Sequence, residues 1–319
     1  MQLIPAEVLL SPGQKQTFHV QMFNAIGKRL GPAKKVEYSI ATQDGKSHKT
    51  EAKAEGIAIG GIGTLKTADG VFEAAADAGH TAMTVTADVD GVTAQARIRV
   101  VPPLPWKFDF NEVPIVEVTN PVTKTKSMQG EPPVTWVGIR HRHVVRDIDG
   151  EKVMVKITTI PRGTRSQGWM GPWQNMHDYT IQADMRGTAV KTDEGFTLPD
   201  MGLIAQRYTL DVMGQKQQLQ LRTWTSQIAT RFSKNVPFEW KGNVWYTIKF
   251  SASVENGKAV LRGKVWPRDQ AEPKDWMIEA EDEEPNLVGA PGLFGNASVG
   301  EIAIDNVSVT PNPTKTAAK

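Results

Sequence analysis

Two segments of the chain alternate polar or aromatic side chains with apolar ones, and their residue types suit recognition of a hydroxyl-rich ligand. Because successive side chains of a strand point to opposite faces, each segment gathers its polar residues on one side. In 217–225 these residues are Gln218, Gln220, Arg222 and Trp224, and in 258–266 they are Arg262, Lys264 and Trp266. Aromatic rings stack on the apolar faces of sugars, while amides and guanidinium groups bond the hydroxyls.

We expect both sets to share one face of a sheet, together with Gln206 and Tyr208 from a strand expected over 202–212. The segment 179–186 shows the same alternation. Polar and aromatic side chains on neighbouring strands predict a carbohydrate-binding surface. The alternative is an ordinary solvent-facing sheet whose side chains pair across strands.

An acidic run over 279–284 is the first place to look for hydrolysis, since a retaining glycosidase needs two carboxylates about 5–5.5 Å apart. Its carboxylates are Glu279, Glu281, Asp282, Glu283 and Glu284. Pro285 closes the run directly after a strand expected over 276–281. We therefore expect a solvated acidic loop, with a catalytic pair as the alternative.

Two other groups of side chains have types that suit a ligand. His141 and His143 are two residues apart, which places both imidazoles on one strand face, and His177 could complete a metal site. The alternative is a pair of exposed or hydrogen-bonded histidines. Trp169 and Trp173 lie in a segment with Gly and Pro. They are either a clamp for the end of a glycan or a plug at one end of a sandwich.

The composition excludes several classes of function. The chain has 319 residues, a net charge of +2 and no cysteine, so thiol catalysis and disulfides are excluded. Lys and Arg are interleaved with Asp and Glu, which gives no basic surface for nucleic acid. No segment reaches the roughly 18 apolar residues of a transmembrane helix. Met1-Gln2-Leu3-Ile4-Pro5 leads straight into a strand, without the pattern of a signal peptide.

The chain reads as two all-β domains. All nine tryptophans lie between Trp106 and Trp276, and the Pro-rich linker 102–105 separates them from a first domain over 1–101. We expect a second domain over 106–311 and a flexible tail over 312–319. Short strands with turn signals predict β-sandwiches, and no helical periodicity is present. The expected hairpin turns are Asp90-Gly91, Asp149-Gly150 and Asn256-Gly257.

Residues 4–101 resemble bacterial immunoglobulin-like domains of adhesins and envelope proteins. The resemblance rests on "EVLLSPGQKQTFHVQMFNAIGK", "VEYSI" and "GTLKTADGVFEAAADAGHTAMTVTADVDGVTAQARIRV". It implies an immunoglobulin-like β-sandwich. The glycine-rich residues 43–63 look like a loop-like insertion into it.

The second domain resembles a concanavalin A-like jelly roll, as found in laminin-G-like and 3-keto-disaccharide-hydrolase-type proteins. The resemblance rests on "YTIQADMRG", "MGLIAQRYTLDVMGQKQQLQLRTW", "VWYTIKFSASVENGKAVLRGKVWP", "EPKDWMIEAEDEEPNLVGAPGLFG" and "IAIDNVSVTP". The acidic run differs from the Glu-x-Asp-x-(x)-Glu motif of the related glycosidases, because Glu281 stands where the motif has Asp.

The order of the two domains, with the joining segment "PPLPW", is similar to the C-terminal region of bacterial PQQ-binding-like β-propeller proteins. Blade repeats of a propeller are absent from the sequence, so the resemblance implies no quinone cofactor. Jelly rolls bring their end strands side by side, and many hold a structural calcium ion there. We therefore expect Asp109 and Asp305, next to Asn306, as candidate calcium ligands, with pairing to Lys or Arg as the alternative.

The resulting prediction is a non-catalytic carbohydrate-binding or cell-envelope interaction module, periplasmic, cell-surface or secreted. Because the resembling domains are mostly extracytoplasmic, we expect a mature or truncated chain rather than a cytoplasmic protein. Two alternatives stay open: a glycoside-active enzyme of the 3-keto-disaccharide-hydrolase type, and a structural subunit of an envelope assembly that uses Trp and Arg as interface anchors.

Overall fold

The computed structural model describes all residues except 44–49, 54–55, 121–122, 140, 159–164, 173, 194, 225–229, 298–299 and 314–319. The described residues form strands and turns, with no helix among them. This confirms the predicted all-β class. Most of the tail expected over 312–319 lies outside the described residues.

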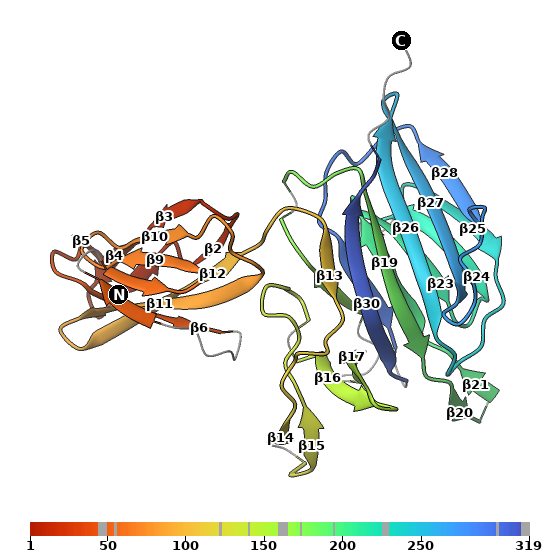
Figure 1. Cartoon of the computed structure of the whole chain (residues 1–319), viewed down its shortest axis with the longest axis horizontal. Helices are drawn as coiled ribbons and strands as arrows, with labels where there is room; N and C mark the ends of the chain where they lie inside the picture. Colours follow the sequence, from red (N-terminus) through yellow and green to blue (C-terminus); the bar gives the residue numbers. More distant parts are fainter. Residues whose placement is uncertain are drawn as a thin grey trace. The chain divides into compact units, whose positions relative to one another are not determined.

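The chain divides into two compact units (Figure 1). Unit 1 comprises Met1–Pro103 and Pro133–Thr135, and unit 2 comprises Leu104–Pro132 and Trp136–Lys319. The short segment Pro133–Thr135 joins unit 1 because Arg97 and Arg99 donate hydrogen bonds to the carbonyl oxygens of Val134 and Thr135. The assignment of residues 1–101 to the immunoglobulin-like family stays a prediction.

Unit 1 contains three sheets. The first has the order β1-β4-β5, with β1 (Gln2–Ile4), β4 (His19–Phe23) and β5 (Arg29–Pro32). The second has the order β3-β10-β9-β8-β7, with β3 (Lys15–Thr17), β10 (Val71–Ala74), β9 (Gly63–Lys66), β8 (Gly56–Ile59) and β7 (Thr50–Lys53). The third has the order β2-β12-β11-β6, with β2 (Glu7–Leu10), β12 (Val92–Val100), β11 (Thr81–Val89) and β6 (Glu37–Thr42).

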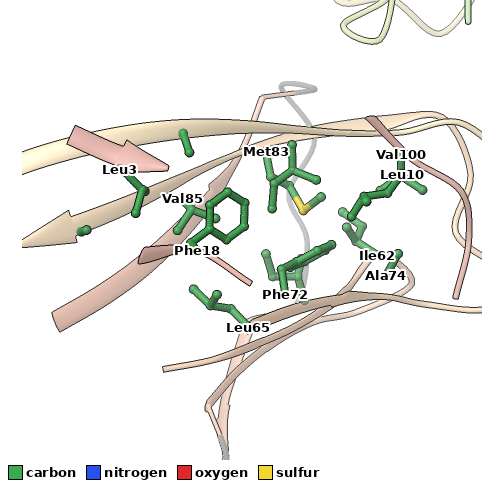
Figure 2. Close-up of a cluster of buried hydrophobic side chains, with 14 of the residues drawn as sticks. Leu3, Leu10, Phe18, Ile62, Leu65, Phe72, Ala74, Met83, Val85 and Val100 are labelled. Atoms are coloured by element: carbon green, nitrogen blue, oxygen red, sulfur yellow. The ribbon is translucent and has the colours of Figure 1, made fainter. Parts of the chain in front are cut away.

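The core of unit 1 lies between these sheets (Figure 2). Phe18, Leu65 and Phe72 point into it together with Met83 and Val85, and all five side chains are fully buried. Burying a side chain of this size stabilises the fold by about 1.5–3 kcal/mol. The apolar alternation of the sequence therefore produces a hydrophobic core that belongs to unit 1 alone.

Two predictions about turns and loops in unit 1 have opposite outcomes. The hairpin turn at Asp90-Gly91 is confirmed, with φ values of 53° and 82° between β11 and β12. The expectation of a loop over 43–63 is wrong, because β7 and β8 lie there. Gly56 lies in β8, where the backbone passes close to that of Leu65 in β9. Only glycine fits there, because a Cβ atom would lie 2.0 Å from the carbonyl oxygen of Leu65.

Unit 2 is built from two large sheets and two small ribbons. The eight-stranded sheet has the order β16-β17-β30-β19-β26-β27-β28, and β13 also pairs with β30. Its strands are β13 (Trp106–Phe108), β16 (His143–Ile148), β17 (Glu151–Lys156), β19 (Tyr179–Gly187), β26 (Tyr246–Glu255), β27 (Lys258–Pro267), β28 (Ile278–Asp282) and β30 (Ile302–Pro311). The hairpin turns at Asp149-Gly150 and Asn256-Gly257 are confirmed by their left-handed φ values.

The six-stranded sheet has the order β18-β29-β22-β23-β24-β25. Its strands are β18 (Arg165–Trp169), β29 (Gly292–Asn296), β22 (Asp200–Ala205), β23 (Tyr208–Met213), β24 (Gln218–Thr223) and β25 (Ser233–Pro237). The ribbons are β14 (Val116–Thr119) with β15 (Lys126–Gln129), and β20 (Val190–Thr192) with β21 (Gly195–Thr197).

The two large sheets pack face to face as a sandwich. Leu210 of β23 reaches β27, where a Cβ on Gly263 would lie 2.7 Å from its Cδ2 atom. Gly295 of β29 likewise faces Ile302 of β30. These contacts define the inner face of each strand, and alternation assigns the remaining side chains to the two outer faces.

One strand prediction for unit 2 needs correction. The single strand expected over 202–212 is a hairpin, β22–β23, whose turn residues Gln206 and Arg207 have φ values of 47° and 63°. This turn lacks the usual Asn-Gly or Asp-Gly signal. Between β13 and β16 the chain forms the β14–β15 ribbon.

The core of unit 1 predicts that residues 1–103 fold without unit 2. The isolated fragment should show β-type circular dichroism and one cooperative unfolding transition. Phe72→Ala should lower its free energy of unfolding by about 3–5 kcal/mol, because that ring is fully buried. As a control, Val92→Ala at a half-exposed strand position should change stability far less. An unfolded wild-type fragment would contradict the division of the chain into independent units.

Candidate functional site

The outer face of the six-stranded sheet carries the strongest candidate site, which we call the aromatic face. Register places its side chains in two rows that cross the sheet. The first row is Trp169, Gly292, Ile204, Thr209, Arg222 and Ser233. The second row is Gln167, Phe294, Gly202, Asp211, Gln220 and Asn235. At about 4.8 Å between strands, each row extends about 24 Å.

Three aromatic rings meet on this face. Trp169 and Trp224 have ring centroids 5.9 Å apart in an edge-to-face arrangement, and Trp224 lies 6.4 Å from Phe294. Trp224 follows the end of β24, and its backbone amide donates a 2.6 Å hydrogen bond to the carbonyl oxygen of Arg207. Both tryptophans stay partly exposed, while Phe294 is buried. The face therefore offers indole surface to a ligand above an apolar base.

Arg222 joins this aromatic group to a buried carboxylate. Its Nε donates a 2.7 Å hydrogen bond to Asp211 Oδ2. Its guanidinium carbon lies 5.8 Å from the ring centroid of Trp224 and 5.7 Å from that of Phe294. Burial raises the pKa of Asp211, and the Arg222 guanidinium acts in the opposite direction. The pair lies largely out of solvent, with exposed side-chain fractions of 11% for Arg222 and 4% for Asp211.

Two buried polar side chains lie beside the Arg222 guanidinium. Thr209 and Asp211 are two residues apart on the same face of β23. Burial raises the pKa of Asp211, whereas the Thr209 hydroxyl acts in the opposite direction by bonding to its carboxylate. Around them the outward side chains of Gln167, Gln218 and Gln220 are partly exposed. The face thus combines aromatic rings with amide groups and two buried polar side chains.

The predicted alternation of 217–225 is confirmed within β24. Gln218, Gln220 and Arg222 are partly exposed, whereas the side chains between them are buried. The prediction that this set shares a face with Arg262, Lys264 and Trp266 is wrong. Those residues lie on β27, in the other sheet, and point to its outer face. Alternation fixes which side chains lie together on one strand, but only strand pairing decides which strands are neighbours.

The β27 residues are occupied with structural contacts. Arg262 pairs with Glu279 at 3.0 Å and with Glu255 at 3.2 Å. Lys264 is buried, bonds Glu272 at 2.7 Å, and has its Nζ 4.7 Å from the ring centroid of Trp276. Trp266 is buried as well. The ion pairs of Arg262 are cross-strand pairs of the kind that stabilise a sheet.

Gln206 and Tyr208, also expected to bind ligand, are fully buried. The Gln206 side chain accepts a hydrogen bond from Asp178 N and donates to the carbonyl oxygens of Asn286 and Leu287. Tyr208 Oη donates to Asp282 at 2.7 Å, and burial together with this bond raises the pKa of Tyr208 to about 12. Both residues anchor the segment after β28 instead of contacting ligand.

Most carboxylates of the acidic run form ion pairs with Arg or Lys. Arg231 bonds both oxygens of Asp282 at 2.7 Å. Lys258 lies 3.6 Å from Glu281 and 2.6 Å from Glu283, and both carboxylates are well exposed. The expected solvated loop fits Glu283 and Glu284, which follow the strand. It is wrong for Glu279, Glu281 and Asp282, which belong to β28, and Asp282 is buried.

The histidine pair does not form a metal site. His141 is exposed in a turn with φ 67°, whereas His143 is buried in β16 and contacts the carbonyl oxygen of Ile139. Burial lowers the pKa of His143 to about 4. His177 pairs with Asp178 at 2.8 Å. Across the described parts of the chain, no group of three His, Cys, Asp or Glu side chains is arranged to hold a metal.

Asp305 faces a second buried carboxylate, Asp184, across β30 and β19. A bulge sets Asn306 at φ 48°, and its amide donates to Asp184 at 2.9 Å and to Asp305 at 3.3 Å. Asp305 Oδ1 has no hydrogen-bond partner among the described residues. Burial and the Asp184 charge raise the pKa of Asp305 to about 6. Asp109 instead accepts a bond from Asn111 N in its own turn.

Sequence reasoning missed the contributions of Asp211 and Phe294. Asp211 lies in an apolar run that we interpreted as one long strand, so its pairing with Arg222 stayed hidden. Phe294 belongs to β29, which the sequence did not indicate as a strand because Pro291, Gly292 and Gly295 lie close to Phe294 in the chain. The interpretation of Trp169 and Trp173 as a pair cannot be followed, because Trp173 lies outside the described residues. Trp169 instead pairs with Trp224.

Comparison with models of known families finds no match, and curated proteins give none either. Among solved structures, the chain is similar to lectin II from Ulex europaeus, with 11% identity over 66% of this chain and 99% of that one and a TM-score of 0.39. The chain is also similar to the metal-free carbohydrate recognition domain of Emp46p, with 11% identity over 56% of this chain and 89% of that one and a TM-score of 0.36. For the SPRY domain of human HERC1 the identity is 11% over 51% of this chain and 92% of that one, and the TM-score is 0.26.

Asp305→Asn should stabilise the protein at neutral pH. Because the folded-state pKa of about 6 lies above the ordinary 3.8, ionisation opposes folding, and stability falls as pH rises from about 4 to about 6. The substitution should therefore raise the free energy of unfolding by about 2–3 kcal/mol above pH 6.5. This gain should disappear below about pH 4.

Urea unfolding at pH 4 and at pH 7.5 measures this difference between variant and wild type. Asp149→Asn is the matched control, since that carboxylate is 82% exposed and its pair with Arg186 is a surface pair. A gain that is equal at both pH values would contradict the raised pKa of Asp305.

Proposed function

We propose that the protein is a carbohydrate-binding module that uses the aromatic face. The observation that carries this proposal is the Trp169–Trp224–Phe294 group, which lies on one face of the sheet with the Arg222–Asp211 pair. Indole rings match the apolar faces of pyranose rings, and hydroxyl-rich ligands supply donors and acceptors to the surrounding amides. This chemistry matches that expected for Gln220, Arg222 and Trp224 from the sequence.

Binding is favoured over hydrolysis by the surroundings of the carboxylates. In the acidic run, Asp282 pairs with Arg231, Glu283 with Lys258 and Glu279 with Arg262. On the face itself, Asp200 accepts bonds from Gly214 N and Asn296, and Asp211 bonds Arg222. A general acid and a base or nucleophile must reach the glycosidic bond, and these groups are engaged in structural contacts. Glu281→Gln should therefore leave glycan binding unchanged.

The cellular setting remains part of this proposal. The resemblance of unit 1 to immunoglobulin-like envelope domains and of the whole chain to the propeller-associated region supports a periplasmic, cell-surface or secreted module. Among the described residues, no helix is long and apolar enough to cross a membrane. An envelope protein that binds unit 1 would be a second partner beside the glycan.

A structural calcium ion is a finer part of the proposal. Asp305 and Asp184 would supply carboxylate oxygens, the ligand type that calcium prefers, while Asp109 is engaged elsewhere. The orphaned Asp305 Oδ1 fits a cation, but Asn306 presents its amide nitrogen to both carboxylates. If calcium binds, adding millimolar Ca²⁺ should raise the melting temperature of the wild type and leave Asp305→Asn unaffected.

Trp224→Ala should weaken glycan binding by roughly 1–3 kcal/mol, because it removes aromatic area and the stacking contribution. Trp169→Ala should have an effect of similar size, since the two rings touch. An array of oligosaccharides identifies the ligand, and calorimetric titration of the purified chain gives the affinities. Thermal melting of the same variants separates binding from stability.

Trp276→Ala is the matched control, because this indole is also half-buried but lies against Lys264 in the other sheet. It should leave glycan affinity unchanged. If Trp224→Ala lowered the melting temperature strongly while affinity stayed the same, Trp224 would be a core residue, and the proposal would lose its central side chain.

A further inference from the structure

The charged side chains described on the aromatic face are paired within the face itself. Arg222 bonds Asp211, and its guanidinium lies near both Trp224 and Phe294. Asp200 accepts hydrogen bonds from Gly214 N at 2.9 Å and from Asn296 at 3.3 Å. Arg222 and Asp211 therefore neutralise each other, so Arg222 presents little free charge to a ligand, while neutral donors hold Asp200.

The accessible polar groups of the face are amides. Gln167, Gln218, Gln220 and Asn296 are partly exposed, and Asn235 is exposed and accepts a 2.8 Å hydrogen bond from Gln220. An amide both donates and accepts and has no net charge, so it matches a hydroxyl. A carboxylate or sulfate on a sugar is matched better by a guanidinium, which binds such groups in a bidentate way.

We propose that the aromatic face selects uncharged glycans and that Asp211 is the residue that sets this specificity, by occupying the one described guanidinium of the face. This inference rests on the proposed function, since it concerns the ligand of the same face. An acidic sugar would have to take Arg222 from Asp211. That exchange would leave Asp211 as a buried carboxylate without its counterion, which is strongly unfavourable, and would bring two negative charges together.

The inference predicts that changing Asp211 gives the protein a new ligand preference instead of only weakening its binding. Asp211→Asn keeps the shape of the side chain and its acceptor oxygen but removes the charge that neutralises Arg222. The variant should gain binding of uronate-containing oligosaccharides by at least tenfold. Because the new attraction is between unlike charges, it should weaken as NaCl is raised from 50 to 500 mM.

The experiment uses the full chain on an array of neutral oligosaccharides of glucose, mannose, galactose and xylose, together with uronate and sulfated oligosaccharides. Calorimetric titration then compares the best neutral ligand with the uronate that has the same linkage. For the wild type we expect the neutral ligand to bind at least tenfold more tightly, with little dependence on salt. Thermal melting shows whether each variant is folded.

Glu279→Gln is the matched control. It changes the net charge by the same amount and removes one carboxylate partner of Arg262, but on the outer face of the other sheet. It should not change the preference for neutral ligands. Because Arg165 pairs with Asn296 in the same sheet, Arg165→Gln is titrated as well and should leave the specificity unchanged.

The outcomes separate the two proposals. If no glycan binds the wild type, the proposed function fails. If glycans bind but uronates or sulfated sugars bind the wild type as tightly as neutral ones, only the inference about charge is overturned. If neutral glycans bind and folded Asp211→Asn gains no uronate affinity, Asp211 is not the determinant. The wild-type comparison decides the ligand class even if Asp211→Asn does not fold.

Discussion

Each strand of unit 2 has two faces, but the sandwich has only one interior, and this constraint shapes the rest of the unit. Leu210 against Gly263 and Gly295 against Ile302 mark where the two inner faces meet. Because burial there contributes about 25 cal/mol per Å² of apolar surface, the apolar half of each strand must point inward. The polar and aromatic half is thereby left for the two outer faces.

The two outer faces use their charges in different ways. On the eight-stranded sheet, Arg262 pairs with glutamates of the two neighbouring strands, and Lys264 pairs with Glu272 of a nearby loop. On the six-stranded sheet, the Arg222–Asp211 pair lies among aromatic rings and amides. The first arrangement is typical of a solvated sheet surface. The second is more costly to build, since buried ions lose hydration, and a function in recognition would account for it.

Buried polar side chains also hold the ends of the sandwich. Tyr179 Oη donates to the carbonyl oxygen of Gly289, and it accepts a bond from Gln206 N. Gln206 and Tyr208 hold neighbouring parts of the same segment. These bonds satisfy backbone groups that would otherwise be buried without partners. Polar residues that looked suited to a ligand are therefore part of the framework that supports β22 and β23.

The sequence by itself determined the local features of this protein. Alternation in 217–225 correctly placed Gln220 and Arg222 on one face of β24, and the glycine turns correctly marked three hairpins. The absence of helical periodicity predicted an all-β chain. These features depend on residues close in the chain, where the period of a strand and the conformational freedom of glycine act directly.

Tertiary structure alone decided which strands are neighbours. It separated Arg222 from Arg262 by assigning their strands to different sheets, and it paired Arg222 with Asp211 across the β23–β24 hairpin. It also brought Trp169, Trp224 and Phe294 together from three distant segments. Such contacts follow from the packing of whole sheets, because each strand's alternation is compatible with many partners and only burial of the complete interior selects among them.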